Sequence, residues 1–122
     1  MRILFIGDVV GAPGRRAVEE RLQALKAELG AGFCIVNGEN AADGVGITPK
    51  LAARILAAGA DVITLGNHTW RRTEIGPYLK TSEQVIRPAN FSASAPGHGL
   101  ALRAAADGTP VAVLNLLGSL FL

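Results

Sequence analysis

The chain alternates between short apolar runs and longer amphipathic stretches. Apolar runs at Ile3–Ile6, Phe33–Val36 and Val62–Leu65 have the length and composition of buried strands. Between these runs, apolar side chains recur at helical spacing, at Val18, Leu22, Leu25 and Leu29 and then at Leu51, Ile55 and Leu56. This β-α-β-α-β order predicts an α/β fold with a parallel sheet and right-handed crossovers.

The ends of the two predicted helices carry residues that favour capping. Gly30 is suited to end the first helix, because glycine adopts the left-handed backbone conformation without strain. Thr48 and Pro49 are suited to the N-cap and first position of the second helix, which we expect to end at Gly59.

After the third run the pattern changes. We predict a short helix over 74–80, a short strand at Val85–Ile86 and a loop over 89–99 that is rich in Ser, Pro and Gly. Leu100–Ala104 and Pro110–Leu117 flank Asp107-Gly108, a strong turn signal for a β-hairpin. We therefore expect an antiparallel hairpin appended to the parallel unit.

Polar side chains follow each of the three predicted parallel strands. Asp8 comes after the first, Glu39 and Asn40 after the second, and Asn67 and His68 after the third. The carboxyl ends of neighbouring parallel strands meet at one edge of the sheet, where open α/β folds bind ligands. Carboxylate and amide oxygens suit hard metal ions, and imidazole suits transition metals. The pattern therefore indicates a metal site at this edge.

Other interpretations of the same residues remain open at this point. Asp8, Asn40 and Asn67 could each serve only to satisfy loop backbone groups. Gly7, Gly11 and Gly14 could form a phosphate-binding loop before a helix, with Glu39 holding a ribose. Their spacing misses the dinucleotide fingerprint, and no Gly-Lys-Ser/Thr follows, so this alternative is the weaker one.

Three further side chains favour ordinary structural roles. Cys34 lies inside a predicted buried strand and is expected to be a core residue rather than a nucleophile. His98 is expected to be an ordinary loop histidine. Trp70 is expected to pack under its loop rather than to stack on a base, although an aromatic side chain beside a site can do the latter.

Length and charge narrow the class of protein. The 122 residues fit a single domain, 1–122, and the formal net charge is only +2. Arg15-Arg16 and Arg71-Arg72 are the only basic pairs, which is a weak signal for a nucleic-acid partner such as RNA. The first apolar run is too short for a signal peptide or a membrane span, so we expect a cytoplasmic protein without membrane contact.

Several motifs taken together resemble one known family. They are Gly7-Asp8-Val9-Val10-Gly11 with Pro13-Gly14-Arg15, Asn37-Gly38-Glu39-Asn40-Ala41-Ala42 with Gly44 and Gly46, Leu65-Gly66-Asn67-His68-Thr69-Trp70, Arg87-Pro88-Ala89-Asn90, and Asn115-Leu116-Leu117-Gly118. This set is similar to the bacterial 2',3'-cyclic-nucleotide 2'-phosphodiesterase family of calcineurin-like metallophosphoesterases. The resemblance runs from Met1 to Leu122, and Gly66-Asn67-His68 alone is shared by the wider superfamily.

The resemblance implies a layered two-sheet sandwich and a site with two metal ions, Fe or Mn. By resemblance, Asp8, Glu39 and Asn40 bind the first ion, Glu39 bridges to the second, Asn67 binds the second, and His68 is the proton donor. The substrate would be a 2',3'-cyclic nucleotide or another small phosphoester. The wider superfamily usually has a histidine where this chain has Val10, a departure that fits the named family.

The resemblance also implies that the chain is incomplete. Family members continue further and supply additional histidine ligands, whereas this chain has only His68 and His98 and stays apolar to Leu122. We therefore expect the amino-terminal half of one metallophosphoesterase domain, with weak metal binding and little activity alone. An apolar face of Val111, Val113, Leu116 and Leu120 would favour a homo-oligomer. The competing function is a non-catalytic nucleotide-binding or interaction module.

Overall fold

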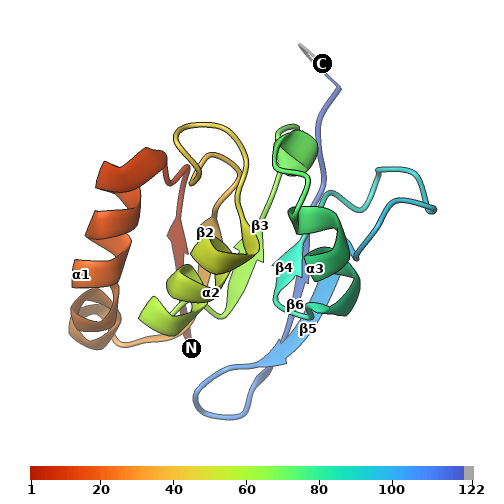
Figure 1. The fold of residues 1–122 in the computed structure, drawn as a ribbon. Coiled ribbons are helices and arrows are strands. Elements are labelled where there is room, and N and C mark those ends of the chain that lie inside the picture. The colour runs from red at the N-terminus through yellow and green to blue at the C-terminus, as the bar shows by residue number, and fades with distance from the viewer. Residues whose placement is uncertain (120–122) are drawn as a thin grey trace.

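A computed structural model describes residues 1–119 and contains two sheets (Figure 1). The first is a four-stranded parallel sheet in the order β1-β2-β3-β4, with β1 at Arg2–Ile6, β2 at Ala31–Asn37, β3 at Val62–Thr64 and β4 at Val85–Ile86. The second is an antiparallel pair of β5, Leu100–Ala104, and β6, Pro110–Leu114. The predicted parallel unit and hairpin are both confirmed.

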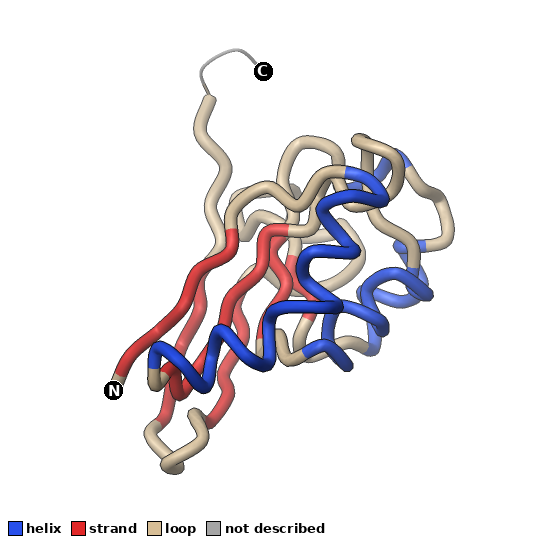
Figure 2. Tube along the Cα trace, turned by 90° about the vertical axis from the view of Figure 1, so that its left-hand side faces the viewer, coloured by secondary structure: helices blue, strands red, loops and turns tan. Residues whose placement is uncertain are grey.

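Helices cover one face of the parallel sheet, and the hairpin covers the other. The helices are α1 at Gly11–Leu29, α2 at Pro49–Ala58 and α3 at Ile75–Thr81, with a 3-10 turn η1 at Thr69–Arg71. Figure 2 shows the helices gathered on one side of the strands. The three layers follow from the alternation of side chains along each strand, which sends successive residues to opposite faces.

Strand β2 shows this alternation directly. Cys34 and Val36 belong to the core beneath the helices, together with Leu22, Ile55 and Leu79. Phe33 belongs to a second core beneath the hairpin, together with Val62, Ile86, Ala101, Val111 and Val113. A strand that is apolar on both faces is typical of a parallel sheet covered on both sides, so the α/β layered fold class is confirmed.

The predicted helix ends are also confirmed. Gly30 follows α1 with φ of 63°, and its N–H donates to Ala27 O at 3.2 Å. At the start of α2 the Thr48 hydroxyl accepts a hydrogen bond from Leu51 N at 3.3 Å, with Pro49 at the first helical position. These capping residues set where each helix begins or ends, and hence where the neighbouring loops begin.

The predicted apolar face of the hairpin is wrong in part. Val111 and Val113 are buried against the parallel sheet, with 9% and 8% of their surfaces exposed. The strand ends at Leu114 rather than Leu117, because the Asn115 side chain turns to donate to Leu65 O and Ile86 O. Leu116 lies two residues after Leu114 and, like Leu114, is exposed, and Leu120 lies outside the described residues. The large apolar side chains that the hairpin does expose are Leu100, Leu102 and Leu114.

Cys34 is fully buried, as expected, and burial raises its pKa from 9.0 to about 11. The folded thiol therefore has a higher pKa than the unfolded one, so its contribution to stability is complete below about pH 9 and is lost as the pH rises through about 11.

We expect no labelling of the Cys34 thiol at pH 8 without denaturant and complete labelling with it. We also expect a smaller alkaline loss of stability in Cys34→Ala than in the wild type. Rapid labelling of the folded chain would contradict this burial.

None of the helices within residues 1–119 has the length and apolar character needed to cross a membrane.

Candidate active site

The five polar residues predicted to form the site lie at the carboxyl edge of the parallel sheet. Asp8 follows β1, Glu39 and Asn40 follow β2, and Asn67 and His68 follow β3. In Figure 1 the loops that carry them extend from the same end of the sheet, at the top of the view. The parallel topology alone brings these three segments to one edge.

Asn40 links Asp8 to His68. Its side-chain nitrogen donates to Asp8 Oδ1 at 2.6 Å, and its side-chain oxygen lies 2.5 Å from His68 Nδ1. An amide accepts at oxygen and donates at nitrogen, so this orientation makes His68 Nδ1 the donor toward Asn40. The loops from all three strands are therefore joined by a continuous chain of side-chain hydrogen bonds.

The backbone holds this chain of side chains in place. Asp8 has φ of 39°, a left-handed conformation that is uncommon outside glycine, aspartate and asparagine. The neighbouring amides are also used within the protein, since Val9 N donates to Asn37 O and Gly11 N to Asn40 O, both at 3.1 Å. The first loop is thus tied to the second along its backbone as well as by its side chains.

These backbone bonds count against the phosphate-binding alternative. A phosphate loop needs amide N–H groups that are free to point at the ligand. Here the amides of Val9, Gly11 and Gly14 donate to protein carbonyls. Gly14 is instead needed for packing, because a Cβ at that position would lie 3.2 Å from Val9 Cγ1.

Glu39 carries the one carboxylate oxygen of the site that is buried and unpaired. Its Oε2 atom is inaccessible to water and has no hydrogen-bond partner among the described residues. Burying an unpaired carboxylate oxygen is costly unless a cation or a donor offsets it. Gly66 makes the position possible, because a Cβ there would lie 2.2 Å from Glu39 Oε2.

Asn67 and His68 complete the candidate site. Asn67 is exposed and His68 is half-buried at the point where the β3 loop enters η1. Within residues 1–119, His, Cys, Asp and Glu side chains form no group of three or more close enough to hold an ion. The amide side chains of Asn40 and Asn67 stand at the same edge as the carboxylates of Asp8 and Glu39 and offer further oxygen atoms there.

Two arginines, Arg15 and Arg72, hold the loop that carries Glu39. In the sequence they stood out only as members of the two basic pairs. Arg15 donates to Ala41 O, while Arg72 donates to Ala42 O at 2.9 Å and to Val45 O at 3.1 Å. Their partners are backbone carbonyls, which every residue carries, so no residue pattern could have shown these contacts. Arg15 and Arg72 are consequently engaged within the protein, which weakens the sequence signal for RNA.

The expectation that Trp70 packs under its loop is wrong. Trp70 is 40% exposed, and its ring centroid lies 6.0 Å from that of Phe91, with the two planes tilted by 37°. His98, by contrast, is an exposed loop residue that lines a shallow pocket with Glu83 and Leu100.

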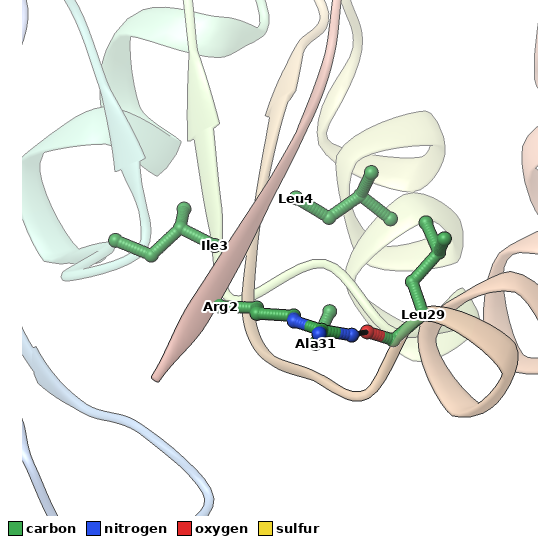
Figure 3. Close-up of a pocket in the computed structure, with 5 residues that line it drawn as sticks. All are labelled: Arg2, Ile3, Leu4, Leu29 and Ala31. Carbon is green, nitrogen blue, oxygen red and sulfur yellow. Dashed lines mark hydrogen bonds between the residues drawn. The ribbon is translucent and has the colours of Figure 1, made fainter.

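One pocket lies away from the candidate site. A pocket of about 400 Å³ is lined by Arg2, Ile3, Leu4, Leu29 and Ala31 (Figure 3). These residues stand where β1 and β2 begin, at the opposite edge of the sheet. Arg2 Nη1 donates to Leu29 O at 2.8 Å, as the dashed line in Figure 3 shows. Arg2 therefore has a structural partner, and the other lining side chains are apolar.

Replacing Gly66 with alanine should displace the Glu39 carboxylate, because the new methyl group would overlap both carboxylate oxygens at 2.2 and 2.7 Å. We expect Mn²⁺ affinity to fall by about 10- to 100-fold, as when groups supporting a metal ligand are lost. The fold should be retained, because the clash is with the end of a side chain. Titration calorimetry with Mn²⁺ and thermal unfolding measure the two effects.

Gly76→Ala is the matched control, since a Cβ there meets nothing within 4 Å. Unchanged Mn²⁺ affinity in Gly66→Ala would show that Glu39 does not bind the ion.

Comparison with known proteins identifies the relatives of this chain. The family described as "YmdB-like protein" matches residues 4–122. The 2',3'-cyclic-nucleotide 2'-phosphodiesterase of Bacillus subtilis (strain 168) is 48% identical over 122 residues, which is 100% of this chain and 46% of that protein.

Two solved structures share the fold. A hypothetical protein from Thermus thermophilus superimposes with a TM-score of 0.90 at 37% identity, covering 100% of this chain and 47% of that one. A novel phosphatase from Mycoplasma pneumoniae gives a TM-score of 0.85 at 31% identity, covering 96% and 43%.

The chain therefore spans less than half the length of the relatives it matches. These matches confirm the resemblance drawn from the sequence motifs. Since the family match covers nearly every residue, the chain belongs to the YmdB-like protein family.

Proposed function

We propose that this chain forms the amino-terminal half of a metal-dependent phosphodiesterase that hydrolyses 2',3'-cyclic nucleotides or similar small phosphoesters. The observation that carries the proposal is the buried, unpaired Oε2 of Glu39 at the same sheet edge as Asp8, Asn67 and His68. The name of the Bacillus subtilis relative supplies the substrate class.

The residues at this edge suit a pair of metal ions. Asp8, Glu39, Asn40 and Asn67 would hold them, with Glu39 between the two, and their oxygen atoms suit Mn or Fe. The Asn40 oxygen faces His68 Nδ1, but a carbonyl oxygen has two lone pairs and can also face an ion. Bound ions would supply an activated hydroxide and would neutralise charge on the phosphoryl oxygens.

His68 is assigned the proton transfer. Its Nδ1 donates to Asn40, so in the imidazolium form Nε2 carries the second proton and can give it to the departing ribose oxygen. Asn40 in turn is held by Asp8. The ring orientation of the proton donor is thus fixed by the same loop that carries Glu39.

The chain alone should bind metal weakly and turn over substrate slowly. The proposed ligands are oxygen atoms from four side chains, and His98 is the only histidine besides His68. Without further histidines each ion has too few protein ligands for a fixed geometry. We expect little or no hydrolysis of adenosine 2',3'-cyclic phosphate by the isolated chain with added Mn²⁺ or Fe²⁺. We expect metal-dependent hydrolysis once the remaining half of a relative is supplied.

The same assay tests the alternatives. Robust turnover by a monomeric 122-residue chain would contradict the half-enzyme proposal. Absence of metal-dependent turnover in the complemented protein, with nucleotide binding retained, would favour the non-catalytic module.

We also propose that the isolated chain self-associates. Leu100, Leu102 and Leu114 leave the outer face of the hairpin apolar, and Ile3 and Phe5 are 51% and 58% exposed on β1. Size-exclusion chromatography of the wild type and of Leu102→Asp measures this directly, and a monomeric wild type would contradict it.

We place the protein in the cytoplasm, consistent with its single free cysteine.

A further inference from the structure

Trp70 is an exposed aromatic side chain held on a rigid turn beside the proposed proton donor. The 3-10 turn η1 begins directly after His68, and Thr69 at its start is fully buried. The Thr69 hydroxyl and amide both donate to Gly66 O, at 2.5 and 3.1 Å, and Arg71 N donates to His68 O at 3.1 Å. The turn is fixed on both sides of Trp70, although Trp70 itself remains 40% exposed to solvent.

A second aromatic ring supports Trp70 from a distant part of the sequence. Phe91 is half-buried, and its ring centroid lies 6.0 Å from that of Trp70. The Phe91 loop is itself anchored, because Ala89 N donates to Asn115 O at 2.8 Å and Phe91 N donates to Pro88 O at 3.2 Å. Phe91 contacts one part of the indole, and the exposed part is available to an aromatic ring of a ligand.

We propose that the exposed face of Trp70 is a stacking surface for the nucleobase of the substrate. This inference rests on the proposed function, because it takes His68 to act at the phosphoester. Trp70 is two residues from His68, so their Cα atoms are at most about 7 Å apart. In a nucleotide, the sugar separates the base from the phosphate by a comparable distance. Stacking tolerates every base, so the site selects nucleotides over simple phosphoesters without reading base identity.

The chain offers a direct readout, because Trp70 is its only tryptophan. The probes are adenosine 3'-monophosphate and ribose 5-phosphate, each titrated with and without Mn²⁺. We expect the adenosine compound to quench the Trp70 fluorescence and to shift its indole N–H resonance, and the base-free phosphate to leave both unchanged. Equal responses to the two probes, or no base-dependent response at millimolar nucleotide, would overturn the proposal.

Variants test whether the base binds at Trp70 itself. Nucleotide affinity, measured from line broadening of the adenine H8 signal, should fall by about 5- to 150-fold in Trp70→Leu, the range for loss of one base–aromatic contact. Trp70→Phe should retain most of the affinity, and Phe91→Leu should lose part of it. Phe5→Leu is the control, since Phe5 is an exposed aromatic on β1, separated from β3 by β2. Unchanged affinity in Trp70→Leu would refute the assignment.

Two further outcomes distinguish nucleobase stacking from self-association and from failure of the proposed function. If the Trp70 signals change with protein concentration rather than with nucleotide, the aromatic surface is a contact between copies of the chain and the proposal fails. If the base-dependent response is present but the complemented protein lacks metal-dependent hydrolysis, the proposed function fails while Trp70 remains a nucleobase site.

Discussion

Replacing His68 with alanine should lower phosphodiester turnover by about 10²- to 10⁴-fold, the usual contribution of a positioned general acid. The expected loss is in proton transfer alone, because the proposed metal ligands are the side chains of Asp8, Glu39, Asn40 and Asn67. Turnover is measured in the chain complemented by the remaining half of a relative, and bound Mn is measured in the same preparation by atomic absorption.

Asp8→Ala provides the contrasting result. It removes a proposed metal ligand and the acceptor of the Asn40 side chain, so we expect both metal content and turnover to fall. Asn40→Ala should affect both functions, because this amide contacts both Asp8 and His68. Equal loss of metal from the His68→Ala and Asp8→Ala preparations would refute the division of roles.

The edge that carries these residues was predictable because its geometry depends on strand order. Three apolar runs separated by amphipathic helices specify parallel neighbours, and parallel neighbours necessarily bring Asp8, Glu39 and Asn67 to one edge. The assignment of individual roles came from the resemblance and remains a proposal. What the sequence could not show is the contact between Glu39 and Gly66, which depends on side-chain placement across two loops.

The predictions that were wrong or incomplete share one cause: the sequence does not show which groups a side chain contacts. Val111 and Val113 alternate with exposed residues, and the strand pattern alone does not say which side of the hairpin faces the parallel sheet. Arg72 binds backbone carbonyls that carry no residue signature. Trp70 is exposed because Phe91, from a loop after β4, occupies only part of its surface.

The loop that carries Phe91 is held by a buried arginine, and this accounts for the second large effect that we expect. Arg87 is only 6% exposed, and its guanidinium donates to four backbone carbonyls at 2.9 to 3.2 Å, those of Pro88, Ala95, Pro96 and Gly97. Arg87 N also donates to His98 O at 3.0 Å. A single side chain therefore organises the loop between β4 and β5.

Replacing Arg87 with methionine should lower the free energy of unfolding by about 3–5 kcal/mol, since four hydrogen bonds at roughly 1 kcal/mol each are lost and their carbonyls are left without donors. Urea denaturation measures the change. The same substitution at Arg54 is the control: Arg54 is a surface residue paired with Glu19 at 2.8 Å, and its loss should cost no more than about 1 kcal/mol. Because the loop carries Phe91, Arg87→Met should also change the Trp70 indole resonance in the folded protein. Equal stability losses in the two variants would show that the Arg87 bonds do not hold the loop.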